Sequence, residues 1–169
     1  MRNRNTFSGD QLTNALHALG VRFLMGGKED DAALNKQPAR LIAALAENDE
    51  ARLRLSLIPL FLEHPEFAVY VRAVSAALNV SARLTLQCYY TAAVWLQQQY
   101  RTRLPIGNRA PLPDHFSREL GVEITADPQE NLKRLAKRHQ ALSGASINWL
   151  GTYEHAAQIW LKGRETQEA

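Results

Sequence analysis

Residues 81–102 read SARLTLQCYYTAAVWLQQQYRT, a stretch with no proline or glycine. Leu84, Cys88 and Trp95 fall on one stripe at helical spacing, and apolar or aromatic residues occupy most of the remaining sides. A helix that is apolar on so many sides is typical of the interior of a protein. We therefore expect a long helix here, capped by Ser81, at the centre of a helical bundle.

Proline, glycine and capping residues divide the rest of the chain into further helical segments. Ser8 and Gln11 form a capping-box pattern, and Asp127 before Pro128 is a strong helix start. Besides 81–102, we expect helices at residues 8–19, 38–47, 50–63, 65–78, from 127 onward and 146–161, and 114–120 is a candidate for a further short helix. No alternating strand series is present, so the predicted fold is all-α: an irregular bundle of six or seven helices. Pro59 lies inside one helix and should kink it, because proline removes a backbone hydrogen bond.

Two segments do not fit helices. Val21–Met25 is short and apolar, but the sequence has no second strand to pair with it, so we expect an extended connector. Leu104–Pro113 holds three of the seven prolines and should be irregular.

The composition bounds the class of protein. The chain has 169 residues, of which 46% are hydrophobic and 22% charged, as in one globular domain. The single cysteine, Cys88, excludes an internal disulfide and suits a reducing cytoplasm. No apolar run approaches the roughly 20 residues of a membrane-spanning helix. We expect one cytoplasmic domain over residues 1–169 without membrane contact, with a flexible tail at 1–6 and a polar C-terminal tail at 162–169.

The residue types that carry catalysis do not occur in recognisable patterns. No zinc-binding pair with HxxxH spacing, nucleophile elbow or phosphate-binding glycine loop is present, and Cys88 has no cysteine near it. The five histidines are scattered: His17, His64, His115, His139 and His155. We therefore expect a protein that is not an enzyme and holds no metal or cofactor.

A basic cluster offers one functional hypothesis. Helical spacing pairs Lys133 with Lys137 and Arg134 with Arg138 on one flank. This flank, with Arg101 and Arg103, is a candidate nucleic-acid contact, although a solvated helix face explains it more simply. The net charge of +3 is low for a dedicated nucleic-acid binder.

Aromatic residues offer a second hypothesis. Core packing is their usual role, but aromatic side chains also dominate binding surfaces. The candidates for contact with a partner are Tyr89, Tyr90, Trp95, Tyr100, Trp149 and Trp160.

Residues 52–67 read RLRLSLIPLFLEHPEF. This segment resembles small uncharacterised bacterial helical proteins, some of which are encoded beside a minimal nucleotidyltransferase. The resemblance implies a helical accessory or antitoxin-like partner of a co-encoded protein, and it assigns no functional residue.

The sequence thus favours a non-enzymatic protein-interaction module, with a nucleic-acid-binding helical protein as the alternative. A homodimer is also expected. Arg52–Val71 and Ser81–Thr102, with Trp149 and Trp160, offer more apolar surface than one small bundle easily covers. The alternative is that a bend at Pro59 wraps the first segment around the core.

Overall fold

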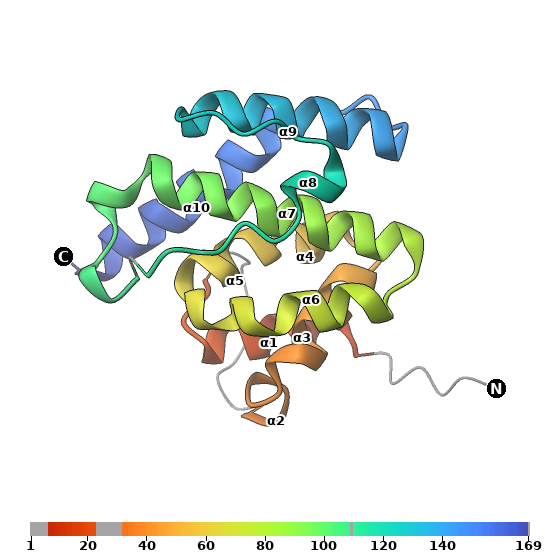
Figure 1. Cartoon of the computed structure of the whole chain (residues 1–169). Coiled ribbons are helices and arrows are strands. Elements are labelled where there is room, and N and C mark those ends of the chain that lie inside the picture. The colour runs from red at the N-terminus through yellow and green to blue at the C-terminus, as the bar shows by residue number, and fades with distance from the viewer. Residues whose placement is uncertain (1–6, 23–31, 109, 169) are drawn as a thin grey trace.

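Figure 1 is a computed structural model of the chain, and it describes residues 7–22, 32–108 and 110–168. Every regular element in those ranges is a helix, so the all-α prediction is confirmed. The α-helices are α1 Gly9–Ala18, α2 Ala32–Asn35, α3 Pro38–Glu47, α4 Ala51–Leu55, α5 Leu57–Glu63, α6 Ala68–Ala77, α7 Val80–Gln99, α8 Ser117–Leu120, α9 Pro128–Ser143 and α10 Trp149–Glu168. Short 3-10 turns are η1 Pro65–Phe67, η2 Arg101–Arg103 and η3 Ile106–Asn108.

Helix α7 is the centre of the fold, as its sequence predicts. Every residue from Leu86 to Gln97 is buried. Figure 1 shows α9 on one side of α7 and α6, α3 and α1 on the other, and α10 packs against α5, α7 and α9. Asn79, not Ser81, caps α7, because its side-chain oxygen accepts a hydrogen bond from the Ala82 N–H at 2.9 Å.

The predicted disruption by Pro59 lies one turn ahead of the proline. The chain breaks at Ser56, between α4 and α5, and Pro59 is in the first turn of α5. A proline lacks the N–H that would bond to the carbonyl four residues earlier, here that of Leu55. The first turn of a helix tolerates proline because its N–H groups have no intrahelical partner.

The C-terminal helix corrects the predicted tail at 162–169, because α10 continues to Glu168. It begins at Trp149, three residues after the expected start. Arg164 forms an ion pair with Glu63 of α5, and the Trp160 indole N–H donates to the same carboxylate at 2.8 Å. These contacts tie the last turns of α10 to the bundle.

The irregular segment after α7 is held by two amide side chains. Gln97 donates to the carbonyls of Asn108 and Ala110 and accepts from the Leu112 N–H. Asn108 donates to the carbonyls of Leu62 and Glu63 in α5. The helix expected at 114–120 is shorter and begins at Ser117, whose N–H is bound by the Asp114 carboxylate at 3.1 Å.

Several predictions concern residues outside the described ranges, namely the tail at 1–6 and most of the connector 21–25. Val21 itself is described and is fully buried. The buried apolar side chains of the described residues form one continuous core. Among the helices of the described ranges, none has the length and apolar character needed to cross a membrane.

Candidate functional site

Helix α6 presents an apolar face to solvent. Six of its ten residues are exposed, and Arg72 is the one polar residue among those six. Val80, the first residue of α7, extends the face. We call this set the α6 surface: Val69, Tyr70, Ala73, Ala76, Ala77 and Val80. Val69 is 77% exposed and Val80 is 81% exposed, so two β-branched side chains lie almost entirely in water.

The inward side of α6 holds this surface in place. Ala68, Val71, Val74 and Ser75 are buried against the core. At the C-terminal end, the Arg83 guanidinium donates to the carbonyls of Ser75, Ala76 and Leu78. A cation at the last carbonyls of a helix satisfies orphan acceptors and complements the helix dipole.

Polar groups lie along one side of the α6 surface. Arg72 donates a hydrogen bond to Nδ1 of His115 at 3.1 Å. Burial, the largest cause, and the Arg72 guanidinium lower the pKa of His115. A hollow of about 370 Å³ beside α6 is lined by Arg72, Ser75, Ala76, Arg83, Gln87, Phe116 and Glu119. An apolar centre with a polar rim is the usual composition of a protein–protein interface.

Four of the six aromatic residues predicted to contact a partner are core residues instead. Tyr89, Tyr90, Trp95 and Trp160 are each at most 5% exposed, because helices pack on every side of α7 and against the inner face of α10. Tyr100 and Trp149 are half-buried. The structure therefore does not support a partner surface made of these side chains.

Several of these aromatic side chains make contacts inside the fold rather than with a partner. The Tyr90 hydroxyl donates to the Pro113 carbonyl at 2.6 Å. His139 Nδ1 lies 2.6 Å from the Tyr153 hydroxyl, and its ring stacks on Trp149 with 3.5 Å between centroids. Burial lowers the pKa of His139 to about 4, so the imidazole is neutral at pH 7.

The six predicted basic residues do not form one free stripe. Arg134 bonds to Glu130 at 3.3 Å and lies 3.7 Å from the Glu123 carboxylate. Arg138 donates to the Leu120 carbonyl at 2.8 Å, and Arg103 pairs with Glu165. Lys133, Lys137 and Arg101 remain exposed.

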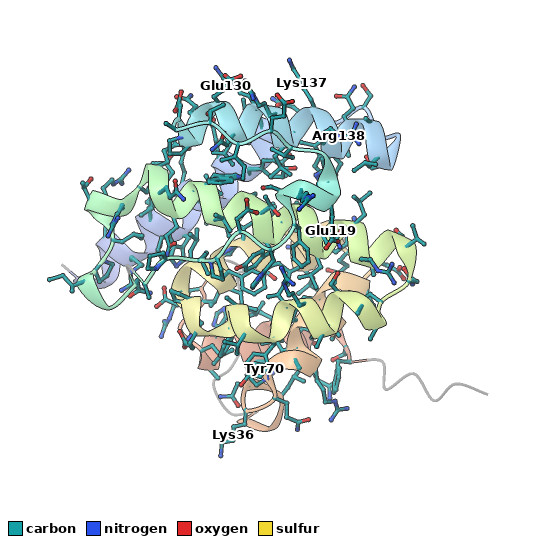
Figure 2. The ribbon with its side chains drawn as sticks, in the orientation of Figure 1. Lys36, Tyr70, Glu119, Glu130, Lys137 and Arg138 are labelled. Atoms are coloured by element: carbon teal, nitrogen blue, oxygen red, sulfur yellow. The ribbon has the colours of Figure 1, made fainter. Side chains whose placement is uncertain are left out.

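Lys137 and Arg138 are adjacent on α9 but point in different directions. In Figure 2 Lys137 points outward from α9, whereas Arg138 points toward the end of α8. Spacing alone places both on α9 but does not show that α8 accepts a hydrogen bond from one of them.

Within the part of the chain that is described, no group of three His, Cys, Asp or Glu residues is placed to hold a metal ion. Burial raises the pKa of Cys88 to about 12, so its thiol stays protonated at neutral pH.

The sequence analysis predicted spare apolar surface within Arg52–Val71, which includes Val69 and Tyr70, but it did not locate that surface on the outward face of α6. The segment AVYVRAVSAA is apolar apart from Arg72 and Ser75, so its pattern does not distinguish the exposed face from the buried one. No family model, no curated protein and no solved structure matches this chain.

Proposed function

We propose that the protein is a non-enzymatic helical interaction module and that its α6 surface binds another protein. The observation that supports this is the exposure of Val69 on α6 and of Val80 at the start of α7, beside an outward face of α6 that carries one charged residue, Arg72. Moving a valine side chain from water into an apolar contact stabilises a complex by about 1.5–3 kcal/mol. A contiguous apolar patch with a polar rim is typical of a protein-binding site.

The shape of the α6 surface favours a helical partner. Val69, Ala73 and Ala77 recur every four residues and form one row along the helix. Because two of the three are alanine, an opposing helix can approach closely. The rim holds Arg72, Arg83 and Glu119, so we expect the partner to carry mainly carboxylates at its flank.

Two occupants deserve testing. The resemblance of residues 52–67 favours a co-encoded protein, with this chain as its accessory or antitoxin-like partner in the bacterial cytoplasm. A second copy of the chain is the other occupant. In Arg52–Val71 the apolar residues from Leu57 to Leu62 are all buried, so a homodimer would rest on the α6 surface rather than on α5.

The test compares two alanine-to-arginine variants. Ala73→Arg places a charge in the middle of the α6 surface, and Ala141→Arg makes the same change at an exposed position of α9. Each variant and the wild type are tagged and co-expressed with the products of the neighbouring genes. We expect co-purification of a partner with the wild type and Ala141→Arg, and at least a tenfold loss with Ala73→Arg.

Light scattering at micromolar concentration separates the two occupants. A mass near twice 19.0 kDa that Ala73→Arg returns to 19.0 kDa identifies a second copy. The proposal fails if Ala73→Arg and the wild type recover the same partners in equal amounts, or if neither a partner nor a dimer is found.

The nucleic-acid alternative has weaker support, because Arg134, Arg138 and Arg103 make contacts within the chain. It predicts binding to duplex DNA or structured RNA that falls steeply with salt, since each neutralised phosphate releases counterions. Titration at two salt concentrations with micromolar protein tests it, and no binding at the lower salt removes it.

A further inference from the structure

A second concave site lies between α9 and the start of α10. It has a volume of about 390 Å³, within the range of roughly 300–1,000 Å³ that is usual for small-molecule sites. It is lined by Lys133, Arg134, Lys137 and Gln140 of α9 and by Asn148 and Trp149 where α10 begins. We call it the α9–α10 groove.

The connection between the two helices builds this groove. Gly144 ends α9 with a φ of +70°, a left-handed conformation that glycine adopts without strain. The chain then turns back, and the Asn148 side-chain oxygen accepts from the Gly151 N–H at 3.0 Å at the first turn of α10. Trp149 is thereby brought against α9.

One wall of the groove is a fixed aromatic ring. Trp149 stacks on His139 with an interplanar angle of 15°, and the edge of Tyr89 supports it at a centroid distance of 6.4 Å. Its indole N–H is buried and has no hydrogen-bond partner among the described residues, so packing and ring stacking hold the side chain. Trp149 is half-buried, so part of its side chain stays uncovered, and the residue lines the groove.

The opposite wall is positively charged. Lys133 and Lys137 lie one turn apart on α9, and both are exposed. Arg134 and Glu130 also line the groove, but they pair with each other at 3.3 Å. Three cations and one carboxylate therefore leave the two lysines uncompensated within the groove.

We propose that the α9–α10 groove binds a nucleoside phosphate, independently of the α6 surface. The base stacks on the uncovered part of Trp149, and the phosphates lie between Lys133 and Lys137. Gln140 and Asn148 place amide groups at the same site, suited to the polar edge of a base. Stacking of a base on an aromatic side chain contributes about 1–3 kcal/mol, and charge-assisted hydrogen bonds to phosphate supply the remainder.

Nuclear magnetic resonance of the full-length chain tests this proposal. The protein has three tryptophans, so a ¹⁵N-labelled sample gives three indole N–H signals, and Trp149→Phe identifies the one from the groove. Titration with ATP should move the Trp149 signal and leave those of Trp95 and Trp160 in place. Adenosine and inorganic triphosphate, each titrated alone, should bind at least tenfold more weakly than ATP.

Matched lysine variants locate the phosphate. Lys137→Gln should weaken ATP binding about tenfold, the usual effect of losing one charge-assisted contact, whereas Lys36→Gln, in the distant turn after α2, should leave it unchanged (Figure 2). The proposal is overturned if ATP moves no Trp149 signal, or if Lys137→Gln binds ATP as the wild type does. If a thymidine decanucleotide binds more tightly than ATP, the proposal of a free nucleotide is wrong and the ligand is single-stranded nucleic acid.

Discussion

Helices α6 and α9 both pack an apolar face against α7, yet their outward faces differ in kind. The outward side of α9 carries Lys133, Lys137 and Gln140, with Arg134 in ion pairs. The outward side of α6 carries valine, tyrosine and alanine. Since packing constrains only the inward faces, the fold requires neither outward composition. A requirement other than the stability of the bundle therefore shapes the two outward faces.

The largest effect should come from breaking an inward face. Leu135 of α9 is fully buried. Leu135→Ala removes buried methyl groups and leaves a cavity, so it should lower the free energy of unfolding by about 2–5 kcal/mol. Leu142→Ala is the matched control, because this leucine of the same helix is 46% exposed and should lose less than about 1 kcal/mol. Urea denaturation measures both, and equal losses would contradict the assigned faces.

Lowering the pH should destabilise the fold through α9, because a buried histidine lies on the inward face of this helix. The pKa of His139 is about 4 in the folded protein and about 6.5 when unfolded. Between these values the unfolded state binds one more proton, so stability falls as pH drops from 6.5 to 4, by roughly 3 kcal/mol in total. Above pH 6.5 this contribution is fully present.

His139→Gln is the variant that isolates this effect. Denaturant unfolding of the wild type and of His139→Gln at several pH values measures it. The variant should have a flatter dependence on pH between 4 and 6.5, and equal slopes in the two proteins would show that another group is responsible.

Neighbouring residues on α9 should behave differently from one another. Arg138 donates to the last turn of α8, and Lys137 points to solvent. Arg138→Ala leaves the Leu120 carbonyl without this donor and should cost about 1–2 kcal/mol of stability. Lys137→Ala should change stability by less than about 0.5 kcal/mol. Thermal unfolding of the two variants measures both losses of stability. A larger loss for Lys137→Ala than for Arg138→Ala would contradict the contact of Arg138 with α8.

The smallest effect on stability should come from the α6 surface. Val69 is 77% exposed, so Val69→Thr should change the free energy of unfolding by no more than about 0.5 kcal/mol. The same change at the buried Val71 should cost at least about 1 kcal/mol, because it places a hydroxyl in the core. If Val69→Thr destabilises as much as Val71→Thr, the α6 surface is part of the core and not a binding site.

The sequence predicted the parts of the fold that depend on local signals. The capping box at Ser8 and the cap at Asp127 are both present, and α7 is buried along most of its length. The extension of α10 was missed because its anchor, Glu63, is remote in sequence.

The candidate sites were predicted less well, since exposure depends on which neighbours are present. Spacing placed Lys133 and Lys137 on one exposed flank but did not reveal that Arg138 bonds to α8. In α6, no local pattern distinguishes the exposed Val69 from the buried Val71. Trp149 was assigned to a partner and instead stacks on His139, at the wall of a groove.

The contact between Glu63 and Arg164 also bears on the order in which contacts form while the chain is synthesised and folds. The two residues are 101 positions apart, so synthesis must continue to Arg164 before they meet. Until then the Glu63 carboxylate stays hydrated and the Trp160 indole has no acceptor there. Contacts of such long sequence separation carry a high loop-closure cost and tend to form late. A chain that stops before residue 160 therefore lacks both of these partners of Glu63.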